Sequence, residues 1–105
     1  MMTAATERAL AETTLRSIMH IPLELLIEGT KLAYSFIVDG HYEQAEVLAR
    51  GLVAADHRNH YFRTLLAGAL QKQGRSDEAV SVLDEGLTYR PGDVELTKMR
   101  AVLVG

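Results

Sequence analysis

The sequence contains no cysteine and no tryptophan, and it has only two prolines. Without cysteine the chain can form no disulfide, no thiolate metal site and no thiol nucleophile. This composition fits a reducing compartment such as the cytoplasm. Because prolines are so scarce, Pro22 and Pro91 mark places where helices begin or end.

Strong charge of one sign and long apolar runs are also missing. The formal net charge is −3, and lysine and arginine occur singly rather than in a basic run with aromatic residues. We therefore expect no nucleic-acid partner. The densest apolar stretch, residues 22–27, contains Glu24 and is too short to span a bilayer. The first eight residues lack the pattern of a secretory signal, so we expect no membrane partner.

What the sequence does contain is a globular, helix-favouring composition. Hydrophobic residues make up 48% of the 105 residues and charged residues 24%, which is ordinary for a folded domain. Alanine and leucine, both strong helix formers, dominate. The composition predicts one all-α domain over residues 1–105.

An internal repeat appears when the chain is laid on itself with an offset of 34 residues. Gly40 and Gly74 match at this offset, and both stand where a helix must end in a left-handed residue. The repeated alanines are small where two antiparallel helices must approach closely. The matching pairs are Leu32 and Leu66, Ala33 and Ala67, Phe36 and Leu70, Gly40 and Gly74, Ala45 and Ala79, and Val53 and Leu87.

Apolar periodicity and capping residues predict the helices. Asn59, Ser76 and Asp93 are the expected N-caps. The expected helices run from about Thr3–Met19, Pro22–Asp39, His41–Ala55, Asn59–Gln73, Asp77–Tyr89 and Val94–Val104. The first of them carries an apolar stripe made of Ala4, Ala11, Leu15 and Ile18.

These positions resemble the tetratricopeptide-repeat (TPR) pattern, which has a large–small pair, then an aromatic residue or leucine, then Gly, Ala and Pro. Pro91 completes the second copy, whereas His57 takes that place in the first, and Gly29 and Arg63 stand where the pattern has Trp. The resemblance implies a TPR-like α-solenoid of antiparallel helix pairs. Its expected parts are an N-terminal helix at 1–21, repeats at 26–59 and 60–93, and a C-terminal capping helix at 94–105.

A TPR resemblance implies that the first helix of each repeat lines a concave, partner-binding side. The residues that map to this side are Ile27, Thr30, Tyr34, Ile37, Val38, Tyr61, Thr64, Gly68, Gln71, Lys72 and Lys98, with Glu95 and Val102 beside them. Gly68 would let a peptide backbone lie close, and the tyrosines could stack on ligand side chains. An equally supported alternative places Ile27, Tyr34 and Ile37 in the core against the N-terminal helix.

No pattern indicates catalysis or a metal site. His57 and His60 flank a loop instead of sharing a helical face, and although Asp56 could be a third ligand, a polar turn between repeats explains these residues better. The acidic pairs Asp77-Glu78 and Asp84-Glu85 fit helix starts and solvated faces better than a catalytic cleft. No nucleophile elbow or phosphate loop is present. We therefore expect no enzyme and no cofactor.

One TPR variant, which clamps a chaperone's C-terminal carboxylate, has Lys or Arg and then Asn at two positions of the first helix. Here those positions hold Thr30 and Tyr34 in the first repeat, and Thr64 and Gly68 in the second. We therefore do not expect a carboxylate clamp.

A closer resemblance is to the TPR chaperones of bacterial type III secretion. It rests on residues 40–45, on Asp56-His57 where other TPRs have Asp-Pro, and on the aromatic pair Tyr61-Phe62. The resemblance implies a cytoplasmic chaperone that holds a segment of a secreted translocator, needle or export component in its concave groove. Some members of that group form homodimers through the N-terminal helix. The alternative function is that of a generic TPR scaffold subunit of a larger complex.

Overall fold

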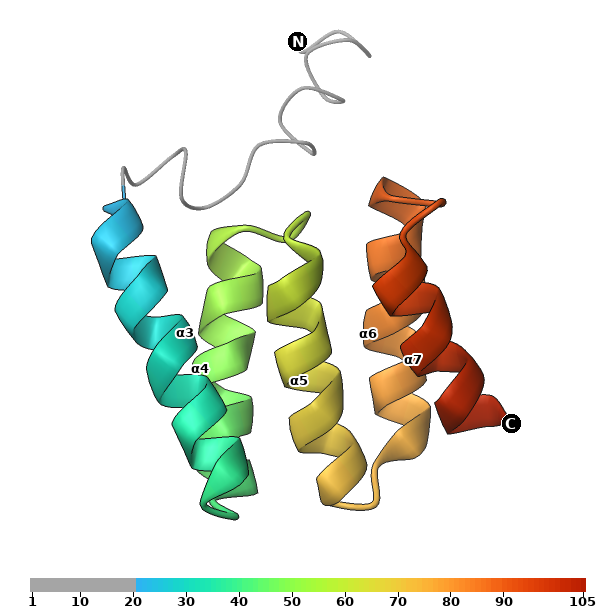
Figure 1. Ribbon diagram of the computed structural model, residues 1–105, viewed down its shortest axis with the longest axis horizontal. Coiled ribbons are helices and arrows are strands. Elements are labelled where there is room, and N and C mark those ends of the chain that lie inside the picture. Colours follow the sequence, from blue (N-terminus) through green and yellow to red (C-terminus); the bar gives the residue numbers. More distant parts are fainter. Residues whose placement is uncertain (1–20) are drawn as a thin grey trace, which may run out of the picture.

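A computed structural model describes residues 21–105, which contain helices and no strand (Figure 1). The helices are α3 (Leu23–Val38), α4 (Tyr42–Ala55), α5 (His60–Lys72), α6 (Ser76–Tyr89) and α7 (Val94–Val104). The all-α prediction is confirmed. The predicted helix at Thr3–Met19 lies outside the described residues.

Each helix packs against the next one along the chain, and α5 also contacts both α3 and α7. Figure 1 shows α3, α5 and α7 toward the viewer, with α4 and α6 behind. We call the surface formed by α3, α5 and α7 the first-helix face, since these are the first helices of successive pairs. This arrangement of stacked antiparallel pairs is the predicted α-solenoid.

The repeated small residues let the helices approach closely. Ala33, Ala45, Ala67 and Ala79 are all 0% exposed. Leu70, Leu83 and Leu96 are the largest fully buried side chains around them, and each contributes about 1.5–3 kcal/mol by leaving water. Leu96 belongs to α7, so the last helix closes the core as predicted.

Two glycines end helices in the predicted way. Gly40 and Gly74 have φ angles of +83° and +77°, which only glycine adopts without strain. In the first case the next amide, of His41, donates to the carbonyl oxygen of Phe36 at 2.8 Å. In the second, the Arg75 amide donates to the carbonyl oxygen of Leu70 at 2.9 Å. Both ends are Schellman motifs that turn the chain back into an antiparallel helix.

Two of the three predicted caps are confirmed. Asn59 Oδ1 accepts from the Phe62 amide at 3.1 Å, and Asp93 Oδ1 accepts from the Leu96 amide at 2.9 Å. The prediction for Ser76 is wrong, because Ser76 is the first residue of α6 and Arg75 takes the cap position without a side-chain bond.

The physical reason is the tightness of this turn. The Arg75 amide completes the Schellman motif at the end of α5, and the same residue is the N-cap of α6. Only Gln73, Gly74 and Arg75 lie between the two helices, so the cap position falls on Arg75 and Ser76 is already helical. The acidic residues Asp77 and Glu78 nevertheless lie in the first turn of α6, where the helix dipole favours negative charge.

Candidate functional site

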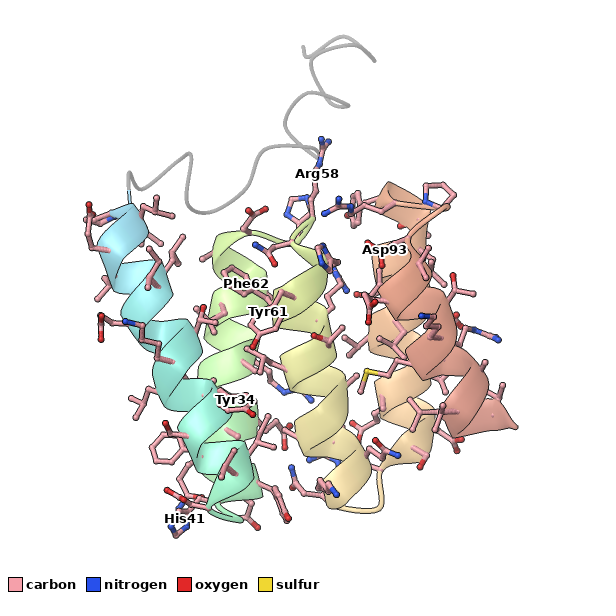
Figure 2. All side chains as sticks on the ribbon, in the orientation of Figure 1. Tyr34, His41, Arg58, Tyr61, Phe62 and Asp93 are labelled. Atoms are coloured by element: carbon pink, nitrogen blue, oxygen red, sulfur yellow. The ribbon has the colours of Figure 1, made fainter. Side chains whose placement is uncertain are left out.

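The first-helix face carries exposed apolar and aromatic side chains. Ile27 is 44% exposed, Tyr34 55%, Val38 65% and Tyr61 43%. They lie outside the core of residues 21–105, whereas Ile37 packs partly against it. Figure 2 labels Tyr34 on α3 and Tyr61 on α5, the two neighbouring first helices. Large apolar side chains gathered on one face are typical of a protein-binding surface.

A groove of about 510 Å³ lies between α5 and α7, and we call it the α5–α7 groove. Its lining residues are His60, Tyr61, Thr64, Glu95, Lys98, Met99 and Val102. Tyr61, Thr64 and Lys98, predicted as partner-binding residues, thus come together here. The sequence analysis missed Met99, which faces the groove from α7 and whose flexible thioether adapts to different ligands.

A smaller groove of about 260 Å³, the α3–α5 groove, lies on the other side of α5. It is lined by Leu23, Leu26, Ile27, Thr30, Lys31, Asp56, Asn59 and Phe62. Ile27 and Thr30 were predicted for this face. The Thr30 hydroxyl donates to the Leu26 carbonyl oxygen at 2.7 Å, so its proton is already used within α3. Recognition in this groove therefore depends mainly on apolar contact.

The remaining predicted residues line neither groove. Tyr34, Ile37 and Val38 lie further along α3, and Gln71 and Lys72 lie near the end of α5. Gly68 is half-buried, and a Cβ atom built on it would lie 3.9 Å from Met99 Cε. The end of the Met99 side chain therefore lies beside Gly68, within van der Waals contact of the position that a Cβ would take.

The loop before α7 fixes one end of the α5–α7 groove. Arg90 Nη1 lies 2.9 Å from His60 Nδ1. Because arginine can only donate, this histidine nitrogen accepts. Asp93, which caps α7, places Oδ2 3.7 Å from His60 Nδ1 and 3.7 Å from Arg90 Nε. These contacts hold the start of α7 against the start of α5.

Two departures from the TPR pattern, His57 of the first repeat and Arg63 of the second, contact each other on the opposite side of α5. Arg63 is 3% exposed, and its guanidinium donates to the carbonyl oxygens of His57 at 2.8 Å and Val82 at 3.0 Å. The His57 ring packs against the Tyr89 ring at an interplanar angle of 54°, with 4.8 Å between centroids. This cluster joins α5, α6 and the preceding loop, so it has a structural role.

A charged network ties α4 to the turn between α5 and α6. The Glu46 carboxylate, with its side chain only 13% exposed, accepts from Gln73 Nε2 at 3.0 Å, Arg50 Nε at 2.9 Å and Arg75 Nη1 at 2.5 Å. Burial by itself would raise the pKa of Glu46. The three hydrogen bonds outweigh burial and hold the pKa below the ordinary value of 4.5.

This network predicts a loss of stability in acid. Since the pKa of Glu46 is lower in the folded than in the unfolded chain, its contribution is fully present above pH 4.5 and is lost as the pH falls through the folded pKa. We expect Glu46→Gln to lose less free energy of unfolding than the parent chain between about pH 7 and about pH 3.5. Urea unfolding at both pH values measures this difference. Glu43→Gln, exposed on the same helix, is the control and should retain the parent's pH dependence.

Within residues 21–105, no three histidine, aspartate or glutamate side chains cluster closely enough to hold a metal ion. In the same part of the chain, none of the helices has both the length and the apolar character needed to cross a bilayer.

A third groove, of about 670 Å³, lies between α3 and α4 and is larger than either groove of the first-helix face. We call it the α3–α4 groove. Leu25 and Leu32, which line it, are 63% and 49% exposed. The sequence analysis did not predict this groove, although Leu32 at a core position of the repeat was the available signal.

Comparisons with known proteins agree with this geometry. A family model described as tetratricopeptide repeat matches residues 37–103. The solved structure of the Yersinia enterocolitica type III secretion translocator chaperone SycD is similar, with a TM-score of 0.83. The match covers 88% of this chain and 69% of that chain at 22% sequence identity, so it establishes a shared fold. No curated protein sequence matches the chain.

Proposed function

The chain belongs to the tetratricopeptide-repeat family, and from this we propose that it is a chaperone for a secreted component of a type III secretion system. TPR arrays are protein-interaction modules whose helices present extended binding surfaces. The similar structure is that of a translocator chaperone. The proposed chaperone acts in the bacterial cytoplasm, where it holds a translocator, needle or export component before secretion.

The observation that carries the proposal is the apolar surface of the first-helix face. In the α5–α7 groove, Tyr61, Met99 and Val102 offer apolar contact, while Glu95 and Lys98 supply one charge of each sign. Such a groove fits an apolar segment with polar flanks, in a helical or extended conformation. Burial of that segment is worth about 25 cal/mol per Å², offset by the cost of ordering it.

We assign the repeats to residues 26–59 and 60–93, with 94–105 as the closing helix. The first helices α3 and α5 then supply the two sides of the α3–α5 groove, and α7 completes the α5–α7 groove. A cargo segment that follows both grooves would cross α5 at Tyr61. Tyr34, further along α3, extends the same face.

We expect the double substitution Tyr34→Ala and Tyr61→Ala to weaken cargo binding by roughly tenfold or more, since exposed tyrosines at interfaces are common hot spots. Helicity and melting temperature should hardly change, because both rings are exposed. Calorimetric titration of the purified cargo segment and thermal unfolding followed by circular dichroism measure the two effects. A large fall in melting temperature would place the tyrosines in the core.

The matched control is Tyr89→Ala. Tyr89 is 43% exposed, the same as Tyr61, but it lies on α6 away from the first-helix face. This variant should bind cargo with the parent affinity, even if loss of its ring contact with His57 lowers stability slightly. Equal loss of affinity in this control and in the double variant would contradict a binding role for the first-helix face.

The cargo itself is tested by co-expression with secreted proteins encoded beside this chain. A secretion chaperone should co-purify with one of them in a one-to-one complex. The alternative, a generic TPR scaffold subunit, should instead bind several different partners. The absence of any stable complex with a secreted protein would contradict the chaperone assignment while leaving the family assignment intact.

A further inference from the structure

The α3–α4 groove is an open apolar surface at the beginning of the solenoid. Its lining residues are Ile21, Leu25, Leu26, Glu28, Gly29, Lys31, Leu32, Ser35, Leu48, Gly51, Leu52 and Ala55. Most of these side chains are apolar or small, and two of them, Leu25 and Leu32, are exposed leucines. Exposed apolar surface gathered in one groove is typical of a site that another element or molecule covers.

The second helix pair shows what kind of occupant is missing. The residues 34 positions after Glu28, Leu32 and Ser35 are Phe62, Leu66 and Ala69, and these are buried at 6%, 3% and 0% exposure. They are buried because α4 packs against α5 on this side.

Gln73, one turn further along the same side of α5, donates to the Tyr42 carbonyl oxygen of α4 at 3.4 Å. Among residues 21–105, no helix packs on the corresponding side of α3 in the way that α4 packs on α5. The α3–α4 groove therefore lies where the repeat array would place one further helix.

We propose that residues 3–19 of the same chain fill the α3–α4 groove as a helix antiparallel to α3. The segment directly precedes Ile21, which itself lines the groove, so only a short turn is needed. A helix of this segment would be about 25 Å long, and α3, with 16 residues, is about 24 Å long. The apolar stripe made of Ala4, Ala11, Leu15 and Ile18 would face Leu25 and Leu32.

The floor of the groove permits close helix packing. Gly29 and Gly51 both line it, and a Cβ atom built on Gly51 would have no neighbour within 4 Å. Small residues on one helix allow another helix to approach. At the offset of 34 residues, Leu15 corresponds to Ala49 and Leu32 to Leu66, and Ala49 and Leu66 belong to one core cluster. The proposed arrangement would therefore bring Leu15 against Leu32.

This arrangement leaves the first-helix face open. The α3–α5 groove uses Ile27 and Thr30 of α3, whereas the α3–α4 groove uses Leu25, Leu32 and Ser35 from the other side of the helix. The N-terminal segment would thus complete the core without occupying the surface proposed for cargo. The inference does not depend on the proposed function.

The absence of cysteine makes a cross-linking test clean. In the full chain without cargo, Leu15→Cys combined with Leu32→Cys should form an intrachain disulfide under mild oxidation, with loss of both free thiols. Leu15→Cys with Tyr34→Cys is the matched control, because Tyr34 is similarly exposed on α3 but does not line this groove. This control should keep its thiols free or react only slowly.

Mixing tagged and untagged chains before oxidation shows whether the segment that fills the groove comes from the same chain or from a second copy. A disulfide that joins tagged to untagged chains would show that a second copy fills the groove and would overturn the proposal. Failure of the 15–32 pair to react in a chain with parent helicity would overturn it too. If that pair disturbs folding, Ala11→Cys with Ser35→Cys, at the exposed Ser35 of the same groove, tests the same packing with the same outcomes.

Discussion

Replacement of Gly86 by leucine is expected to destabilise the fold by about 3 kcal/mol, one of the largest effects of any single substitution in this chain. A Cβ atom built on Gly86 would lie 2.7 Å from Arg63 Cδ and 2.9 Å from Leu96 Cδ1. Neither neighbour moves easily, because Leu96 is fully buried and Arg63 is held by two backbone carbonyl groups. Urea unfolding measures the loss.

The first repeat suggests a second substitution that would restore part of the stability lost in Gly86→Leu. At an offset of 34 residues, Gly29 corresponds to Arg63 and Leu52 to Gly86. In the first repeat the contact joins a small residue on the first helix to a large one on the second helix. In the second repeat the two sizes are exchanged. In the first repeat, a Cβ on Gly29 would lie 3.2 Å from Leu52 Cδ2.

The double variant Arg63→Gly with Gly86→Leu rebuilds the first-repeat combination in the second repeat. We expect it to be more stable than Gly86→Leu alone, with a coupling energy of about 1 kcal/mol or more in a double-mutant cycle. Recovery should be incomplete, because the carbonyl groups of His57 and Val82 lose their donor. Independent, additive effects of the two substitutions would refute the reciprocal packing.

The second large effect is expected from Ala45→Leu. Ala45 is 0% exposed on α4, where three added carbon atoms must push neighbouring helices apart or adopt a strained rotamer. We expect a loss of about 1–3 kcal/mol and, at about 4–8 °C per kcal/mol for a domain near this size, a clear fall in melting temperature. Ala79→Leu, at the equivalent position of the second repeat, should behave alike.

Ala54→Leu is the matched control, with the same substitution on the same helix at an exposed position. Its effect should stay within about 0.5 kcal/mol of the parent, as for most surface changes. Thermal and urea unfolding of the pair give the comparison directly. Similar losses at both positions would mean that helix propensity, not overpacking, governs the response.

Some local features could be predicted well from the sequence. Gly40 and Gly74 end helices with positive φ, and Asn59 and Asp93 cap helices through their side chains. Each of these depends on a few neighbouring residues, so the sequence pattern is sufficient. Ser76 was predicted wrongly because its role depends on how tightly Gly74 and Arg75 turn the chain, which a residue preference alone does not reveal.

The candidate site could be predicted only in part. Tyr61, Thr64 and Lys98 meet in one groove because α5 and α7 pack side by side. Met99 was missed because an apolar residue in a closing helix is equally consistent with a core position. The α3–α4 groove was missed because Leu32 and Leu66 occupy the same repeat position, although one is 49% and the other 3% exposed.

The sequence by itself determined the 34-residue period, the helical class and the residues that begin and end most helices, because propensity, capping and glycine geometry act over a few residues. Only the tertiary structure decided which of two equivalent side chains is covered and which groove stays open. The reason is that the burial of a side chain depends on which second helix packs over it. The α4 helix covers Leu66 on α5, while no helix of residues 21–105 covers Leu32 on α3.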